Sequence, residues 1–509
     1  MNIVIVGGGT AGWLTALYAK KVFNSDNIIL IESEKIGILG AGEGASPNFD
    51  NLLNFLDIPF TDIIKNCNAT IKTGIKFTNW SKNKNSYFHP FFQYNNASND
   101  NNFTLKTTFL ENDTNFCHYY ASLNNENFND YALIQKASDK FLVPYIKNSE
   151  NNIIEQTGET SLHFDARLLA SYLRSVGEKR NIIRKEGIVE KIFNNKDGYI
   201  NKIKTNKETI KCDFVFDCSG FNKLIIGKHY KGVWKSYSEY LPTKKAIPFF
   251  LKMDEKIPPY TEAIAMNFGW MWKTPLQNRY GCGYVFDSNY ISDEDAIKEI
   301  EKHLGFQPEY PLKQKGAFTF FAGSFENIWI KNCLAVGLSS GFIEPLEATS
   351  ITQTINILRR FLSDKQNIIT KNENIKEKFN YINSDETQKI VDFIYLHFVT
   401  NKKNNTFWKN FTKNNKMPKQ IEYILSVSND KVLNYDFDFY NNSFFGLSSF
   451  HYTLIGNEII DRKSMKKNIN FSLDDTKKQD YQNILNNQKI LIPKLLTHNE
   501  LLDIITKGE

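Results

Sequence analysis

The first dozen residues of this chain restrict its fold more than any other stretch. A β-branched apolar run is followed by Gly7, Gly9 and Gly12, in the spacing G-x-G-x-x-G, and then by an apolar helical pattern. In a strand–turn–helix unit these glycines allow a tight turn, a close approach of pyrophosphate to the backbone, and packing of the helix on the strand. A second apolar run, 28–31, ends at Glu32, where an acid can hold a ribose hydroxyl. The sequence therefore predicts a Rossmann-type dinucleotide-binding unit.

Size and composition are those of a large globular protein. A chain of 509 residues exceeds one ordinary domain, so we expect two or three lobes with sizeable cores. Aromatic residues make up 14% of the chain, with 40 Phe and 24 Tyr, which suits large cores and a pocket for a flat ligand. The net charge of +6, from 62 basic and 56 acidic residues, is mild and dispersed, so it gives no indication of a nucleic-acid partner.

Cysteine spacing and hydropathy argue against several other classes. The six cysteines show no C-x-x-C spacing, so the sequence predicts neither a metal site nor a disulfide framework, and buried thiols in a reducing cytosol are the favoured interpretation. The first strand begins at residue 2, which leaves no room for a signal peptide. No apolar run approaches the ~18 residues of a membrane span. We expect a soluble cytoplasmic protein without a membrane partner.

Later segments extend the nucleotide-binding unit. Asp165 precedes an amphipathic helix, and strands are expected near 187–193 and 199–204. The run 215–221 reads as a buried strand that ends in Asp and Gly, which is how a returning strand reaches the cofactor in flavoprotein monooxygenase-like folds. Residues 245–290 also have the patterning of a sheet.

Lysines in the segment 71–80 and a histidine in the segment 86–92 lie among apolar residues, and each has both a structural and a chemical interpretation. The strand pattern at 71–80 places Lys72 and Lys76 on one face, where a lysine is most often exposed to solvent. His89 lies in an aromatic run, 86–92, that would normally be core. From the residues alone, the structural interpretation is favoured for both segments.

Two segments further along the chain are more unusual. Trp270 and Trp272, two of only seven tryptophans, lie two apart on a strand that Pro275 ends, so both point to one face of it. An apolar strand at 333–338 leads through glycine and serine into a helix that begins around 345–349. A strand, a glycine turn and a helix start again form a cradle for an anion or a cofactor.

Together these motifs resemble one family, the FAD-dependent halogenases of the tryptophan halogenase type, over most of the chain. The most specific motif is W-x-W-x-I-P, which is present at 270–275 with Thr274 in place of Ile. The opening G-G-G-T-A-G-W, the segments 40–43 and 217–221, and the F-W pair at 407–408 are similar to the family's sequence as well.

The resemblance implies an α/β fold and a flavin cofactor. Residues 1–360, with a mixed-sheet region at 160–290, would form a Rossmann-type FAD-binding module of the flavoprotein monooxygenase kind, and residues 361–509 a largely helical substrate-binding region packed on it. Reduced FAD would come from a separate NAD(P)H-dependent flavin reductase. The residues expected to bind the cofactor are Gly7, Gly8, Gly9, Ala11, Gly12, Glu32, Ser33, Ala41, Glu43, Gly44, Leu338 and Ile351.

The resemblance also changes the interpretation of Lys76 and identifies a catalytic carboxylate. The family's catalytic lysine lies on an I-K-F-x-N-W strand, which this chain reproduces around Lys76, and its glutamate lies in a P-L-E-S-T segment, where this chain has Glu347. The serine after that glutamate is Ala348 here, so a hydroxyl is missing. Chloride or bromide is expected on the backbone N–H groups of Thr349 and Ser350, the second of which stands where the family often has glycine.

In the chemistry that the resemblance implies, reduced FAD, oxygen and a halide ion give hypohalous acid, which passes inside the protein to the substrate. Lys76 either polarises this acid through a hydrogen bond or forms a haloamine, and the sequence leaves both routes open. Glu347 stabilises the cationic arene intermediate and takes its proton. Trp270 and Trp272 separate the flavin from the substrate, which disfavours direct oxygen insertion.

The expected substrate is an indole or another electron-rich aromatic, with free tryptophan as the leading candidate. His89 and Phe91 match family positions that sandwich an indole ring. Phe450 replaces a tryptophan that is common in the family's C-terminal pocket, and a phenyl ring cannot form a polar contact with an indole N–H group. Residues that would bind the carboxylate of a free amino acid are not evident.

Two other functions stay open at this stage. One is a flavin monooxygenase or dehydrogenase of the same architecture that does not halogenate, against which Lys76 and the tryptophan pair argue. The other is a non-catalytic flavin-binding protein, in which Ala348 and Phe450 mark a loss of activity. A homodimer is compatible with the sequence.

Overall fold

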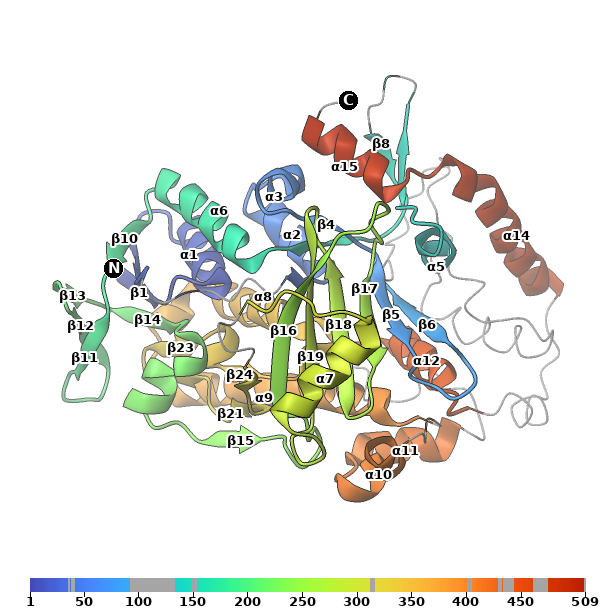
Figure 1. Cartoon of the computed structure of the whole chain (residues 1–509). Coiled ribbons are helices and arrows are strands. Elements are labelled where there is room, and N and C mark those ends of the chain that lie inside the picture. The colour runs from blue at the N-terminus through green and yellow to red at the C-terminus, as the bar shows by residue number, and fades with distance from the viewer. Residues whose placement is uncertain are drawn as a thin grey trace. The chain divides into compact units, whose positions relative to one another are not determined.

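The computed structural model in Figure 1 describes residues 1–34, 37, 42–91, 133–148, 150, 153–311, 316–400, 402, 405–428, 433, 444–460 and 475–507. The chain divides into two compact units, each made of three separate segments. The first unit comprises Met1–Ala69, Phe164–Ser238 and Phe321–Gln388, and the second unit comprises Thr70–His163, Glu239–Phe320 and Lys389–Glu509. The predicted division at residue 360 concerns which part binds cofactor and which binds substrate, and it stays a prediction.

The first unit is built on a six-stranded sheet with the strand order β10-β2-β1-β14-β23-β22. All neighbours pair in parallel except β22 and β23. The sequence explains why the central strands are covered on both faces, because their runs of Ile, Val, Leu and Phe lack polar alternation. The strands are β1 Asn2–Val6, β2 Asn27–Glu32, β10 Ile183–Glu186, β14 Phe214–Asp217, β22 Trp329–Ile330 and β23 Cys333–Ala335.

Helices cover this sheet and bring loops to one end of it. Helix α1 (Thr10–Val22) packs against α6 (Ala166–Lys179) and α8 (Thr349–Leu362). The carboxylate of Asp165 accepts the backbone N–H groups of Arg167 and Leu168 at 3.0 and 3.2 Å, so it caps the N-terminus of α6. This cap agrees with the helix start that the sequence predicts.

Smaller elements complete the first unit. The strands expected near 187–193 and 199–204 are β11 and β12, which form an antiparallel sheet with β13. A second small sheet has the order β15-β21-β24. The remaining elements of this unit are β3 Glu43–Gly44, α2 Asn48–Phe55, α3 Phe60–Asn66, β11 Val189–Asn194, β12 Ile200–Thr205, β13 Thr209–Lys211, η2 Gly220–Asn222, η3 Leu224–His229, β15 Trp234–Ser236, β21 Gly323–Phe325, η4 Gly337–Ser339, β24 Gly341–Phe342, η5 Pro345–Glu347 and η6 Lys365–Ile368.

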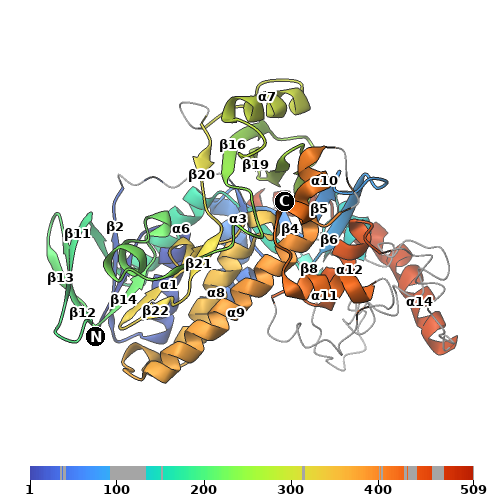
Figure 2. The ribbon, with the colours of Figure 1, turned by 90° about the horizontal axis from the view of Figure 1, so that it is seen from below.

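Helix α9 (Glu373–Phe398) runs beside α8, as Figure 2 shows. Polar contacts hold the two together within the first unit. Glu386 of α9 accepts hydrogen bonds from the Asn356 side chain and from the Arg360 guanidinium of α8, both at 2.7 Å. Because Glu386 is buried, these two donors satisfy a carboxylate that would otherwise be costly to remove from water.

The second unit contains a seven-stranded sheet with the order β20-β16-β19-β18-β17-β5-β6. Only β17 and β5 pair in parallel. The predicted sheet at 245–290 is confirmed, since it supplies β16 to β19. The strands are β5 Gly74–Thr78, β6 Ser86–Pro90, β16 Lys245–Lys252, β17 Thr261–Ala265, β18 Gly269–Pro275, β19 Arg279–Phe286 and β20 Phe318–Thr319.

A short strand, β4 (Thr70–Lys72), precedes β5 and pairs with β9 (Ser161–Phe164) rather than with the large sheet. Thr73 separates β4 from β5. The other elements of this unit are α5 Leu133–Ser138, β7 Tyr145–Lys147, β8 Ile153–Gln156, α7 Asp293–Leu304, α10 Thr406–Asn414, α11 Lys419–Ser428, α12 Leu447–Gly456, α14 Asp475–Leu491, η8 Ile492–Lys494 and α15 His498–Lys507.

Three general features bear on function. Five cysteines fall in the described part of the chain, and all are buried with free thiols. No group of three or more His, Cys, Asp or Glu side chains among the described residues is placed to hold a metal ion. Within the same residues, none of the helices combines the length and apolar character that crossing a bilayer requires.

Candidate functional site

The turn between β1 and α1 has the geometry of a phosphate cradle. Gly7 has φ +120°, and a Cβ there would lie 2.1 Å from the carbonyl oxygen of Cys218. A Cβ on Gly12 would lie 1.9 Å from the carbonyl oxygen of Gly7. Beside Gly9, by contrast, no atom lies within 4 Å of the place where a Cβ would be. Two of the glycines thus allow the backbone to pack on itself, and the third borders open space at the N-terminus of α1, where an anion is favoured.

Glu32 ends β2 next to this turn. A Cβ on Gly8 would lie 1.6 Å from Oε2 of Glu32, so the carboxylate lies directly against the glycine turn. Its other oxygen, Oε1, accepts a hydrogen bond from Nε of Arg184 at 2.5 Å. A second guanidinium, that of Arg174, lies 3.7 Å away. The arginines hold one carboxylate oxygen in place, which fits a role in binding a ribose hydroxyl with the other.

Several other predicted cofactor residues meet at the same end of the sheet. Gly337, which has φ +69°, lies against Ala11, because a Cβ there would be 2.6 Å from the Ala11 methyl group. The Ser339 hydroxyl accepts the backbone N–H of Gly220 at 2.9 Å. Shortly after β3 in the chain, the hydroxyl of Ser46 lies 2.6 Å from the hydroxyl of Thr352 on α8. These contacts bring the glycine turn, the end of β14, the Leu338 segment and the start of α8, with Ile351, into one region.

Glu43 of β3 stands out electrostatically. Burial, with a smaller contribution from the nearby Asp165 carboxylate, raises its pKa to about 7. Glu43 is nevertheless exposed to solvent, so its raised pKa results from the many protein atoms around the carboxylate and not from complete removal from water. Gly44 follows it in the same strand and Ser33 follows Glu32, whereas Ala41, also predicted to bind the cofactor, lies outside the described residues.

The start of α8 fits a halide site. Ala348 takes a left-handed backbone conformation, φ 54° and ψ 40°, and turns the chain into α8. Thr349 and Ser350 are the first two helical residues, and N–H groups at such positions have no acceptor within the helix. The Thr349 side chain is 0% exposed, and its hydroxyl has no hydrogen-bond partner among the described residues. A buried hydroxyl beside free N–H groups suits a small anion.

Glu347 precedes this turn within η5 and is 6% exposed. Burial and its place beside the expected halide-binding residues fit the predicted role as a general base. Glu344, four positions before Ala348, is completely buried as well.

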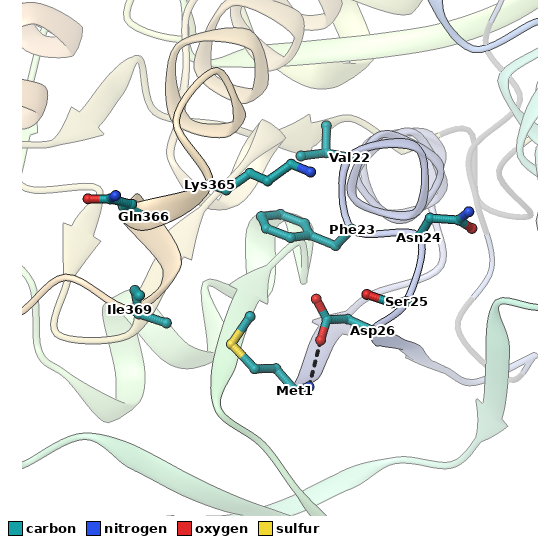
Figure 3. Close-up of a pocket in the computed structure, with 9 residues that line it drawn as sticks. All are labelled: Met1, Val22, Phe23, Asn24, Ser25, Asp26, Lys365, Gln366 and Ile369. Carbon is teal, nitrogen blue, oxygen red and sulfur yellow. Dashed lines mark hydrogen bonds and ion pairs between the residues drawn. The ribbon is translucent and has the colours of Figure 1, made fainter.

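A pocket of about 540 Å³ opens elsewhere on the first unit (Figure 3). It lies at the end of α1 and beside η6, where Phe23 and Ile369 line it. The Met1 amino group and the Asp26 carboxylate form an ion pair of 2.6 Å at its edge. None of the residues predicted to bind cofactor, halide or substrate lines this pocket.

In the second unit, Lys76 is anchored on β5. Its Nζ donates to Oδ1 of Asp139 at 3.1 Å and lies 5.4 Å from the centre of the Tyr260 ring. Burial alone would lower the pKa of Lys76, but the nearby Tyr260, Asp139 and Glu262 outweigh this and raise the pKa above its ordinary value. The lysine side chain is 24% exposed and its Asp139 partner 48% exposed. Lys76 is therefore a charged member of a partly exposed ion pair.

Strand register separates Lys76 from the predicted substrate residues. Lys76 is opposite Phe88 on β6, whereas Ile75 is opposite His89. Because neighbouring residues on a strand point to opposite faces, Lys76 and His89 lie on opposite faces of the sheet. Trp272 is opposite Ala263, which is next to Phe77, so the tryptophan pair shares the face of His89.

A second lysine, Lys72, is more deeply buried than Lys76. Lys72 ends β4 and is 1% exposed, which makes it one of the largest fully buried side chains of the described residues. Its Nζ lies 5.4 Å from the ring centre of Phe91, a predicted substrate residue. The charge of Lys72 is also close enough to His163 to add to the burial that lowers the pKa of that imidazole. Sequence reasoning noticed Lys72 only as a neighbour of Lys76 on the same strand face.

The predicted substrate residues His89 and Phe450 meet in an aromatic cluster, formed by His89, Phe393, Phe445, Phe450 and Tyr452. Nε2 of His89 is 2.9 Å from the hydroxyl of Ser449, which adjoins Phe450 on α12. The ring centres of Phe393 and Phe450 are 5.0 Å apart, and those of His89 and Phe393 5.7 Å apart. Phe393, which lies on α9, was not predicted as a substrate residue.

Trp270 and Trp272 lie side by side on β18, with ring centres 6.3 Å apart. Trp272 covers Gly283 of β19, where a Cβ would lie 1.9 Å from the indole ring. Trp272 therefore packs across two strands, because a glycine on the neighbouring strand leaves room for its indole ring. A wall of two indoles on one face is what the sequence predicts.

Comparisons with known proteins agree with these observations. The sequence profile described as tryptophan halogenase matches residues 2–470. The tryptophan 6-halogenase of Streptomyces toxytricini is 30% identical over 436 residues, which cover 82% of each chain. The tryptophan 7-halogenase of Lentzea aerocolonigenes is 29% identical over 443 residues, covering 80% of this chain and 78% of that protein.

Solved structures with a similar fold are flavin-dependent halogenases as well. The tryptophan C-6 flavin-dependent halogenase from taromycin biosynthesis is similar with a TM-score of 0.85 and 25% identity, covering 99% of both chains. A flavin-dependent halogenase from Brevundimonas is similar with a TM-score of 0.80 and 25% identity, covering 98% of both. The fold predicted from the sequence, a Rossmann-type α/β flavoprotein fold, is thereby confirmed.

Proposed function

The chain belongs to the tryptophan halogenase family and is a flavin-dependent halogenase that uses reduced FAD and a halide, and we propose that its substrate is an indole, with free tryptophan as the leading candidate. The single observation that carries the substrate proposal is the buried aromatic cluster around His89. Aromatic rings favour stacked or edge-to-face contacts with other aromatic rings, so this cluster suits a flat aromatic substrate. Relatives named as tryptophan halogenases support the same class of substrate.

The overall reaction balances in atoms and electrons. An arene, a halide ion, oxygen, reduced FAD and one proton give the aryl halide, oxidised FAD and two molecules of water. Bound reduced FAD supplies the two electrons with which oxygen is activated to oxidise the halide to hypohalous acid. We assign the cradle at Gly9 and Glu32 to the cofactor, and the N–H groups of Thr349 and Ser350 with the Thr349 hydroxyl to the halide.

The amine that directs the oxidised halogen is Lys72 in our proposal, although the motif had indicated Lys76. Lys72 is buried and lies over Phe91, while Lys76 faces the other side of the sheet from His89 and is paired with Asp139. A reactive halogen needs an amine that is shielded from water, because exposed sites would lose it to solvent. Lys72 meets this requirement.

Glu347 completes the proposed chemistry as the base. Its carboxylate would stabilise the positive charge that develops on the arene when the halogen adds, and then remove the proton from the substituted carbon. The proton leaves to the carboxylate while the ring regains its aromatic electrons. We propose that the tryptophan pair, Trp270 and Trp272, keeps substrate and flavin apart.

The function is tested by incubating the purified protein with FAD, a flavin reductase, NADH and chloride or bromide, over a panel of indoles, phenols and tryptophan. Mass spectrometry should show a halogenated product, and Glu347→Gln should keep flavin binding while losing most turnover. A hydroxylated product without halide incorporation would instead indicate a monooxygenase of the same fold.

The two lysines are separated by paired variants. Lys72→Ala should abolish halogenation, with a loss on the order of 100-fold or more, because removing a group that acts directly on the reacting atom has effects of this size. Lys76→Ala, the matched control one strand away, should keep activity within about 3-fold since an ion pair with an exposed partner contributes little. The reverse pattern, with Lys76→Ala inactive and Lys72→Ala active, would restore the motif-based assignment.

A further inference from the structure

We propose that His498, on the C-terminal helix α15, is a positioning residue for the Lys72 amine. The inference rests on the proposed role of Lys72. Helix α15 begins beyond residue 470, where the match to the halogenase profile ends, and His498 is 426 residues along the chain from Lys72. The juxtaposition is therefore a property of the folded second unit rather than of a sequence motif.

The imidazole of His498 joins two backbone groups. Its Nε2 accepts the backbone N–H of Ile71, the residue before Lys72, at 2.9 Å. Its Nδ1 lies 3.1 Å from the carbonyl oxygen of Ile257. Because a backbone N–H can only donate and a carbonyl oxygen can only accept, the ring must be neutral and carry its proton on Nδ1. His498 is completely buried, and this burial lowers its pKa to about 4.

Strand β4 depends on this contact because it is only three residues long. Ile71 is at its centre, and its N–H is buried together with the rest of the strand. If the acceptor were removed, this N–H would stay in the interior without a partner, and the strand would shift to find one. A shift of β4 moves Lys72, because Lys72 is the next residue of the same strand.

His498 is itself held firmly. Its backbone N–H donates to the carbonyl oxygen of Phe141 at 2.8 Å. Just before it, Leu496 exchanges hydrogen bonds with the Val143 N–H and the Tyr145 carbonyl, both at 2.9 Å. The segment that carries the imidazole is thus fixed by backbone contacts that do not involve β4.

A neighbouring residue offers a matched control. The Asn499 side chain accepts the Ile257 N–H at 3.1 Å and donates to the Glu255 carbonyl at 2.7 Å. It therefore anchors α15 to the same loop that His498 contacts. Neither of these two hydrogen bonds involves β4, so the loss of the Asn499 side chain weakens the helix without removing the Ile71 acceptor.

The test measures aryl halide formed per reduced flavin oxidised, with a soluble thioether to capture hypohalous acid that escapes. His498→Leu should lower this ratio by roughly 10- to 100-fold, the range expected when a catalytic group is displaced by about 1 Å. The captured hypohalous acid should rise by as many moles as the aryl halide falls. His498→Gln, whose side-chain oxygen can accept the Ile71 N–H, should keep the ratio within about 3-fold of wild type. Asn499→Leu should lower the melting temperature and leave the ratio unchanged.

Adding Lys72→Ala separates the two levels of the proposal. The double variant with His498→Leu should be no worse than Lys72→Ala alone, because the two residues act through one amine. If Lys72→Ala lowers the ratio and His498→Leu does not, the positioning role of His498 is wrong. If Lys72→Ala leaves the ratio unchanged, the assignment of Lys72 fails and the inference fails with it. Should His498→Leu not fold, His498→Gln is compared with His498→Asn, whose shorter side chain cannot reach Ile71, and equal ratios in the two overturn the proposal.

Discussion

Ala348 holds a backbone conformation that non-glycine residues rarely adopt, and it does so between two proposed functional residues. Its φ of 54° and ψ of 40° reverse the chain between Glu347 and the first turn of α8. Such a conformation costs on the order of 1–2 kcal/mol for a residue with a Cβ. The turn immediately precedes the first N–H groups of α8 and the buried Thr349 hydroxyl, so the strained residue lies at the proposed halide site.

The Thr349 hydroxyl, which has no partner among the described residues, leads to a prediction in which halide binding weakens while stability does not fall. Thr349→Val should raise the KM for chloride or bromide by about 10-fold or more, since a hydrogen bond to a charged group is worth roughly 1.5–3 kcal/mol. The melting temperature should stay the same or rise, because the change removes a buried hydroxyl without a partner among the described residues. Steady-state kinetics at varied halide and thermal unfolding give the two readouts.

Ser350→Ala is the matched control for this prediction. Only the backbone N–H of Ser350 is proposed to contact the halide, and that group survives the substitution. The KM for halide should therefore change by less than about 3-fold, which is below the effect of losing one charge-assisted hydrogen bond. An equal increase in KM for Thr349→Val and Ser350→Ala would contradict a specific role of the Thr349 hydroxyl.

The two lysines show where sequence reasoning at residue scale reached its limit. Alternation along 71–80 assumes one continuous strand, and on that assumption Lys72 and Lys76 are equivalent. The strand is interrupted at Thr73, whose N–H donates to the Pro259 carbonyl and whose carbonyl accepts the Phe91 N–H. Lys72 therefore belongs to a different sheet from Lys76. Such a break depends on partners far along the chain, so local periodicity does not reveal it.

At the scale of elements, the turn between β1 and α1 makes separate use of its glycines. The positions at Gly7 and Gly12 have no space for a Cβ, whereas Gly9 has extended backbone and open space around it. Packing requirements explain the first two, and access for a ligand explains the third.

Paired substitutions in this turn should separate binding from folding. Gly9→Val should leave the melting temperature of the flavin-free protein within about 2 °C of wild type, as expected for a change that touches nothing. It should weaken FAD binding by at least about 10-fold, because the added side chain occupies the space where the pyrophosphate approaches. Gly12→Val should lower the melting temperature itself, since its Cβ would meet the Gly7 carbonyl at 1.9 Å. Flavin fluorescence titration and thermal unfolding distinguish the two variants, and a strongly destabilised Gly9→Val would show that this glycine serves packing instead.

Elements with local signals were predictable, and elements fixed by distant partners were not. The β1–α1 turn, the Asp165 cap of α6 and the strands of 245–290 follow from glycine spacing, capping chemistry and hydrophobic periodicity. The role of α15 leaves no such signal, because its contact with β4 is a single side chain bonded to backbone across more than four hundred residues. Likewise, nothing in the sequence near Phe393 distinguishes a residue of the aromatic cluster from ordinary core.

At the scale of the whole molecule, buried neutral histidines tie stability to pH. Burial lowers the pKa of both His498 and His451 to about 4, and it also lowers the pKa of His163. In the unfolded chain a histidine takes up its proton near pH 6.5, so between that pH and about 4 the unfolded state binds more protons. Each buried neutral histidine therefore makes its full contribution to the free energy of unfolding above about pH 6.5. Below that pH the contribution falls by roughly 1.4 kcal/mol per pH unit.

This linkage gives a prediction that does not require activity. Going from pH 7 to pH 5 should change the melting temperature less favourably in the wild-type protein than in His498→Gln, because the variant has one fewer buried imidazole to protonate. Thermal unfolding at constant ionic strength measures the difference between the two slopes. Parallel slopes would mean that His498 carries its proton equally in the folded and unfolded states.

The interleaving of the two units has a consequence for synthesis on the ribosome. The nucleotide-binding unit is encoded at both ends of a long interval, so its parallel sheet stays incomplete until β22 and β23 have emerged, and the helix pair α8–α9 follows later still. Strands made early in translation must therefore wait, with their apolar edges uncovered, while the intervening segments of the other unit are produced. A gene fragment that stops near codon 360 would encode neither unit whole, which makes separate expression of a flavin half and a substrate half a poor strategy for this enzyme.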